Sequence, residues 1–175
     1  MARIPYANLD NDQVRPLADR IIEERGSILH LYQMLLHSPP VAEGWLGYLT
    51  AIRQKSSLNG ALRELVIVRI AQINGAAYEA EQHIPIALKE GATQAQLDAL
   101  ENWESASCFN ETERRVLALT EEMTRNVHVP PAVVDALKAD FSHRELVELV
   151  ATIAAYNMVS RFLEALGIDS ADPRD

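Results

Sequence analysis

Cysteine is almost absent from this chain, which contains only Cys108 among its 175 residues. A single cysteine excludes an intrachain disulfide, and it excludes a C-x-x-C redox motif. Glycine, with seven residues, and aromatic residues, at 6% of the chain, are also sparse. Strands and the tight turns between them draw on both groups, so their scarcity favours helices over sheets.

An excess of basic residues is also missing, and the formal net charge is −9. Binding to phosphates requires a concentrated basic surface, so we expect no nucleic-acid partner and no anionic membrane. The first residues lack the apolar segment of a signal peptide. The apolar stretches Leu65–Ala71 and Leu149–Val159 are shorter than the ~20 residues that cross a bilayer. We therefore expect a soluble cytoplasmic protein.

Hydrophobic residues make up 48% of the sequence, and their spacing is helical throughout. No alternating strand pattern and no linker occurs, so the sequence predicts an all-α fold with a single compact multi-helix domain over residues 1–175. A polar tail is expected from about residue 169 to 175. The expected helices cover about residues 10–24, 27–36, 39–54, 61–73, 76–90, 93–101 and 110–125, a short segment from 130, and 142–166.

Three ionisable residues stand within the apolar central helices. Glu79 and His83 are four residues apart, which places them one turn apart on the same helix face. A carboxylate beside an imidazole can fix its tautomer and form a proton-transfer pair. Glu64 lies on the preceding helix, and Asn74-Gly75 can reverse the chain between the two helices. The pattern predicts that Glu64, Glu79 and His83 converge in one partly buried pocket.

This arrangement resembles the carboxymuconolactone decarboxylase and alkyl hydroperoxidase D-like family. The resemblance rests on the order and spacing of Leu62-Arg63-Glu64-Leu65, Asn74-Gly75, Tyr78–His83, and Ala87 with Gly91-Ala92-Thr93. In the peroxidase branch, it implies a catalytic glutamate at Glu64, a tyrosine at Tyr78 and a histidine at His83. The cysteine pair of that branch falls on Ala76 and Glu79, which can perform no thiol chemistry. The chain therefore resembles a member without the cysteine pair.

The resemblance implies general acid–base chemistry on a small organic acid or lactone. His83 would donate or accept the proton, Glu79 would orient it, and Glu64 would act as a second proton relay. Tyr78 would donate a hydrogen bond to a developing enolate or carboxylate oxygen. No organic cofactor is implied. Family members commonly assemble, so a homo-oligomer, either a trimer or a hexamer, is expected.

Other interpretations of these residues remain open. Glu64 can serve as a helix-start glutamate paired with arginine, Tyr78 as a packing residue, and Glu79 as an ordinary helix glutamate. Glu79 and His83 supply only two possible metal ligands, too few for a tight site, so no metal is predicted. The competing functions are a peroxidase-like protein without its thiols and a non-catalytic oligomeric protein that binds small molecules.

Overall fold

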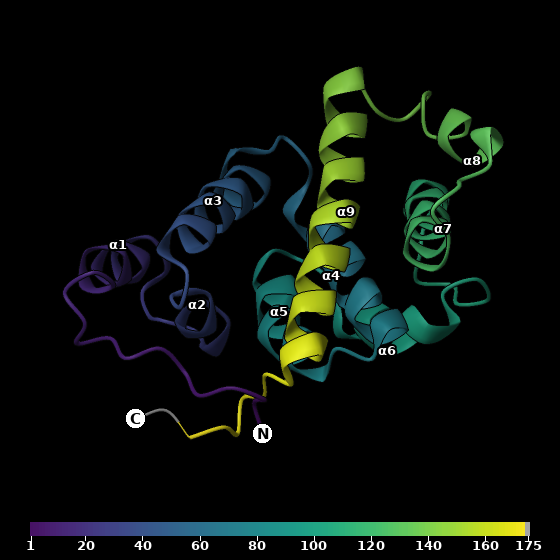
Figure 1. Ribbon diagram of the computed structural model, residues 1–175. Helices are drawn as coiled ribbons and strands as arrows, with labels where there is room; N and C mark the ends of the chain where they lie inside the picture. Colours follow the sequence, from purple (N-terminus) through teal and green to yellow (C-terminus); the bar gives the residue numbers. More distant parts are fainter. Residues whose placement is uncertain (174–175) are drawn as a thin grey trace. The chain divides into compact units, whose positions relative to one another are not determined.

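The computed structural model describes residues 1–173, and every regular element within them is helical (Figure 1). The expected all-α fold is confirmed. The last two residues of the expected polar tail lie outside the described residues. The chain forms two compact units, the first from Met1–Lys55 with the C-terminal segment from Leu163, and the second from Ser56–Phe162. The expectation of a single domain stays a prediction.

The first unit contains three α-helices and a π-helical turn. Their bounds are α1 Arg15–Arg25, α2 His30–Leu35, α3 Pro39–Thr50 and the π-helix η1 Ala51–Lys55. The expected start of the first helix at Asp10 is wrong, because the Asn8 and Asn11 side chains accept the backbone N–H groups of Asp10 and Gln13 and hold turns instead. The expected helix ending near residue 54 is observed as α3 continued by η1.

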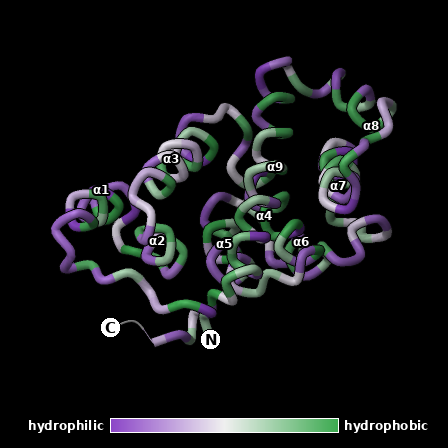
Figure 2. The backbone as a smooth tube through the Cα atoms, viewed as in Figure 1, coloured by the Kyte–Doolittle hydropathy of each residue, from purple (hydrophilic) through white to green (hydrophobic). Residues whose placement is uncertain are grey.

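The second unit contains the remaining helices. Their bounds are α4 Gly60–Asn74, α5 Ala77–Lys89, α6 Gln94–Ala99, the 3₁₀ turn η2 Leu100–Asn102, α7 Glu111–Arg125, α8 Pro131–Asp135 and α9 His143–Leu166, whose last residues belong to the first unit. Helix α7 contains both hydrophobic and hydrophilic residues along its whole length (Figure 2), and its buried residues recur at a spacing of three or four, which is typical of a helix with one buried side.

Helix α4 is the centre of the second unit. Nine consecutive residues, Arg63 to Ala71, are buried, so no side of this stretch faces solvent. Leu65 and Val68 pack in a cluster with residues of the segments that follow, including Trp103 and Leu117. Burial of each large aliphatic side chain in such a cluster contributes roughly 1.5–3 kcal/mol of stability. The interior position of α4 places its polar residues where water cannot compete for them.

The turn between α4 and α5 is as short as the sequence predicts. Gly75 adopts φ +68°, a left-handed conformation that costs glycine little, and caps α4. The amide of Ala76 then donates to the carbonyl of Ala71 at 2.9 Å, and α5 begins at the next residue. The two helices therefore pack as an antiparallel hairpin.

Two capping boxes begin α6 and α7, and they are joined to each other. Thr93 and Gln96 exchange side-chain and backbone hydrogen bonds at the start of α6, and Asn110 and Glu113 do so at the start of α7. The Gln96 side-chain amide also donates to Oε1 of Glu113 at 3.0 Å. The Glu113 carboxylate therefore accepts hydrogen bonds from residues at the starts of both α6 and α7.

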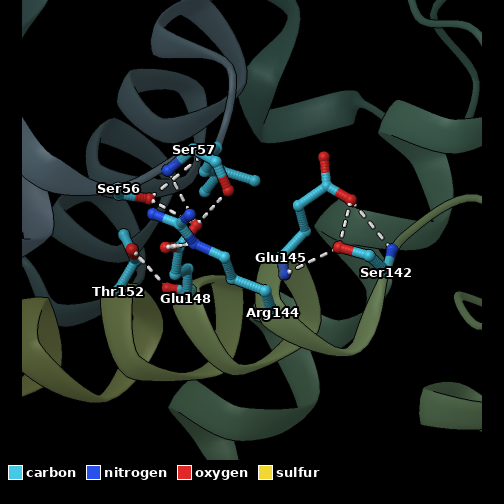
Figure 3. Close-up of polar contacts among 8 residues, drawn as sticks. Ser56, Ser57, Ser142, Arg144, Glu145, Glu148 and Thr152 are labelled. Atoms are coloured by element: carbon cyan, nitrogen blue, oxygen red, sulfur yellow. Dashed lines mark hydrogen bonds and ion pairs between the residues drawn. The ribbon is translucent and has the colours of Figure 1, made fainter.

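Glu148 on α9 fixes the segment that leads into α4. Its Oε2 atom accepts hydrogen bonds from the Ser56 hydroxyl and from the amide and hydroxyl of Ser57, while Oε1 accepts from Arg144 (Figure 3). Nearby, Ser142 and Glu145 form the expected S-x-x-E box at the start of α9.

Helix α9 is longer than its apolar stretch alone indicates. Its 24 residues are long and apolar enough, by length and composition only, to cross a membrane. Over half of the relevant window is buried in the structure, as in the core helix of a globular protein. The absence of a membrane partner stays a prediction.

Candidate functional site

The candidate site is built on the α4–α5 hairpin. Glu64 lies on α4, and Tyr78, Glu79 and His83 lie on α5. All four side chains are buried, with residue exposures of 0% for Glu64, 2% for Glu79, 5% for Tyr78 and 8% for His83. A carboxylate taken out of water in this way requires charged or hydrogen-bonded partners.

The structure brings Glu64 and His83 into direct contact. Nδ1 of His83 lies 2.6 Å from Oε2 of Glu64, the short distance of a charge-assisted hydrogen bond. An ionised carboxylate can only accept, so Nδ1 carries the hydrogen and donates it. In the neutral imidazole this leaves Nε2 as the acceptor, the form that can remove a proton from a substrate.

Glu64 has a second charged neighbour. Nε of Arg63 donates to Oε1 of Glu64 at 3.2 Å, and Nη2 of the same guanidinium lies 3.8 Å from Oε2 of Glu90. Oε1 of Glu64 is thus paired with an arginine, which was one of the interpretations of this residue from the sequence. Oε2 of Glu64 makes the contact with His83. The positive charge of Arg63 favours the ionised form of Glu64 that His83 needs as its acceptor.

Glu79 is held from α9. The Ser160 hydroxyl donates a short hydrogen bond to Oε2 of Glu79, and Ser160 itself is completely buried. From the sequence, we expected Glu79 to orient the His83 ring. In the structure, the carboxylate that accepts the hydrogen bond from Nδ1 of His83 is that of Glu64. Glu79 and His83 still lie one helical turn apart on α5.

Two residues of α9 at this site were missed by sequence reasoning. The ring of Tyr156 meets the His83 ring edge to face, with centroids 5.0 Å apart and an interplanar angle of 89°. Ser160 follows Tyr156 by four residues, so both lie on the same face of α9. The signal in the sequence that could have found them is a pair of polar-tipped side chains at this spacing in an otherwise apolar helix.

Three further residues with polar side chains, Arg69, Trp103 and His37, make structural contacts. Arg69 forms an ion pair with Glu121, and the Trp103 indole donates to the same carboxylate at 3.3 Å. Nε2 of His37 lies 2.7 Å from the carbonyl oxygen of Pro5. Within residues 1–173, no group of three or more His, Cys, Asp and Glu side chains is arranged to hold a metal ion.

Comparison with known proteins places this hairpin in a family. The carboxymuconolactone decarboxylase family matches residues 39–122, a range that runs from the start of α3 into the last turn of α7 and contains all four candidate residues. The uncharacterized protein YnjA of Escherichia coli (strain K12) is 32% identical over 130 residues, which cover 71% of this chain and 66% of that protein. The chain belongs to the carboxymuconolactone decarboxylase family.

Solved structures show that the fold is also that of alkyl hydroperoxidase D-like proteins. An alkylhydroperoxidase AhpD core protein, the uncharacterized peroxidase-related protein from Ralstonia eutropha JMP134, has a TM-score of 0.83 at 20% identity, covering 98% of this chain and 93% of that one. A debrominase, Bmp8, in complex with 2,3,4-tribromopyrrole has a TM-score of 0.81 at 18% identity, covering 97% and 93%. Ala76 and Glu79, the positions to which the resemblance assigns the cysteine pair, are both buried.

Proposed function

We propose that this carboxymuconolactone decarboxylase family member catalyses proton transfer on a small organic acid or lactone. The observation that carries the proposal is the buried 2.6 Å contact between Nδ1 of His83 and Oε2 of Glu64. A carboxylate behind one imidazole nitrogen prepares the other nitrogen for acid–base work. His83 is the most exposed of the four residues, so its ring edge is the surface that a substrate would reach.

The proposed reaction is a decarboxylation or a related proton shift beside a carbonyl group. The bond to the substrate carboxylate breaks, carbon dioxide leaves, and the electron pair stays on the carbon as an enolate. Nε2 of His83, which takes up the proton of the substrate's carboxylic acid group before this bond breaks, then returns that proton to the carbon. Glu64 stabilises the imidazolium form, and Tyr78 donates a hydrogen bond to the enolate oxygen. Glu79, whose Oε2 accepts from the Ser160 hydroxyl, lies one helical turn from His83 and acts as a second proton relay.

The debrominase provides indirect support for a small-molecule substrate. Its structure contains a brominated pyrrole, which shows that a protein of this fold accommodates a small ring. A peroxidase function finds no support, since neither Ala76 nor Glu79 can attack a peroxide. We propose a cytoplasmic enzyme that needs no organic cofactor.

A test uses a panel of carboxylated lactones and β-keto acids in deuterated water, with proton NMR to follow substrate loss and deuterium incorporation. His83→Ala should lower the rate by about 10²–10⁴-fold, the usual contribution of a general acid–base group. Glu64→Gln should lower it less, because the tautomer is kept but the negative charge is lost. His128→Ala, at an exposed histidine, is the matched control and should retain the wild-type rate.

A second candidate function is a non-catalytic oligomeric protein that binds small molecules. The observation in its favour is that Glu64, His83 and Glu79 already have hydrogen-bond partners within the chain, through the Arg63–Glu64–His83 and Ser160–Glu79 contacts, as in a structural polar network. Binding of panel members without turnover, or turnover that is unchanged in His83→Ala, would favour this alternative.

A further inference from the structure

A cavity of about 330 Å³ lies among α7, the loop that follows it, α8 and α9. Figure 1 shows α7 and α8 close together, and residues from both line the cavity. Much of its wall is apolar, formed by Leu119, Met123, Val134, Val150 and Ala154. Its lining, within the part of the chain that the structure describes, includes none of the four candidate catalytic residues. The volume is at the small end of the range of about 300–1,000 Å³ found for ligand pockets.

The polar part of the cavity is organised by Asn157. This buried side chain donates to the Thr124 hydroxyl at 3.1 Å and to the Ile153 carbonyl at 3.0 Å. Its oxygen accepts from Asn74 at 3.1 Å and from Nη1 of Arg161 at 3.0 Å. Because its donors and acceptor are all engaged, Asn157 is fixed in place, and it in turn restrains the guanidinium of Arg161.

Arg161 carries a positive charge that no carboxylate of residues 1–173 pairs with. Its hydrogen bonds go from Nη1 to the backbone and side-chain oxygens of Asn157, both uncharged. Among residues 1–173 no carboxylate forms an ion pair with it, whereas Arg125, which also lines the cavity, pairs with Glu121. The Nε and Nη2 atoms of Arg161 make no hydrogen bond to a described residue. Two adjacent guanidinium nitrogens match the two oxygens of a carboxylate.

We propose that this cavity binds a small organic monocarboxylate with an apolar tail. The carboxylate would lie on Nε and Nη2 of Arg161, and the tail would pack against the aliphatic wall formed by α7, α8 and α9. In a chain of net charge −9, a restrained arginine that no described carboxylate pairs with, beside an apolar cavity, selects an anion with a hydrophobic body. The proposal concerns binding alone and does not depend on the chemistry at His83.

Isothermal titration calorimetry of the full-length protein with hexanoate, 1-hexanol and acetate tests separately the contributions of the ligand's charge and of its apolar tail to binding. Hexanoate should bind saturably with one site per chain. Hexanol, which lacks the charge, and acetate, which lacks the tail, should each bind about tenfold more weakly. Arg161→Gln should weaken hexanoate about tenfold without affecting hexanol. Lys138→Gln makes the same change of net charge at an exposed residue outside the lining and should bind like wild type.

A second variant tests the cavity independently of the charge. Ala154→Phe places a large side chain in the wall and should abolish hexanoate binding, while circular dichroism confirms the fold. Three results would overturn the proposal. They are equal binding of hexanoate and hexanol, hexanoate binding that is unchanged in Arg161→Gln or Ala154→Phe, and no saturable binding at all. A change of assembly mass on adding hexanoate would overturn it too, since the cavity would then belong to a contact between chains.

Discussion

The carboxylate of Glu148 accepts hydrogen bonds from the amide and the hydroxyl of Ser57, at 2.8 and 2.6 Å, across 91 residues of sequence. The bond from the Ser57 hydroxyl is the largest cause that lowers the pKa of Glu148, to about 2, although burial opposes it. The Arg144 guanidinium and the Ser56 hydroxyl lower this pKa further. The ionised form of Glu148 therefore joins the start of α9 to the segment before α4.

The first prediction concerns stability against pH. The folded pKa of Glu148 is depressed, so its contribution is fully present above the unfolded pKa of about 4.5 and is lost as pH falls toward about 2. Glu148→Gln should lower the free energy of unfolding at pH 7 by about 1–2 kcal/mol, a value discounted for solvent screening. Urea denaturation of both proteins from pH 7 to pH 2.5 should show this difference shrinking below pH 4.5. Glu164→Gln, at an exposed glutamate of the same helix, should show no such convergence.

The second prediction concerns the contact between Ser160 and Glu79. Ser160→Ala removes a buried donor from a carboxylate that is itself 2% exposed, so unfolding free energy should fall by about 1–3 kcal/mol. A double-mutant cycle with Glu79→Gln should give a coupling energy of about 0.5–3 kcal/mol. Additive effects of the two substitutions would show that the hydroxyl does not support Glu79.

The third prediction is the absence of thiol peroxidase activity. Ala76 and Glu79 occupy the positions where the peroxidase branch has cysteines, and Cys108 lies outside the α4–α5 hairpin. A coupled peroxide assay with a dithiol reductant should stay at background for wild type and for Cys108→Ser alike. A turnover of about 1 s⁻¹ or more by either protein would contradict this interpretation of the site.

The fourth prediction concerns assembly into a trimer or a hexamer. The apolar stretch Arg63 to Ala71 of α4 is buried by its own chain, so it offers no surface to a partner. Exposed apolar side chains do occur one turn apart on α5, at Ile84 and Leu88, with exposures of 36% and 42%. Such pairs on a helix face are typical of a subunit contact.

Sedimentation at micromolar concentration measures this directly. Wild type should sediment as a multiple of 19.5 kDa, and the double variant Ile84→Lys, Leu88→Lys should shift toward the monomer mass. Val41→Lys, at an exposed valine of α3, is the control and should assemble normally. A wild-type protein that sediments as a monomer would refute the prediction.

Much of the fold could be predicted because it depends on local chemistry. Gly75 after Asn74 predicted the α4–α5 turn. The helix starts expected near 93 and 110 are observed as capping boxes at Thr93 and Asn110, and each is settled within four residues. The start of α1 was wrong because asparagine side chains that favour turns competed with an apolar pattern that favours a helix. The π-helical turn at the end of α3 has no sequence signal that we recognise.

The candidate site was predictable only in part. The helical period guarantees that Glu79 and His83 share a face, but it does not decide which group each one binds. That choice depends on how far α4 is shifted along α5, which sets Glu64 against His83, and on α9, which brings Ser160 to Glu79 from 81 residues away. Tertiary register of this kind is not encoded in the spacing of residues along a single helix.

The link between the capping boxes of α6 and α7 has a consequence for local opening. Because the Glu113 carboxylate accepts from Gln96 as well as from the Asn110 amide, fraying of one helix start releases a partner of the other. The first-turn amides of both helices should therefore exchange with deuterium as one cooperative unit, with similar opening free energies. Glu113→Ala should speed exchange at both helix starts together, as expected of a single foldon, although eleven residues of non-α-helical chain, 100 to 110, separate α6 from α7.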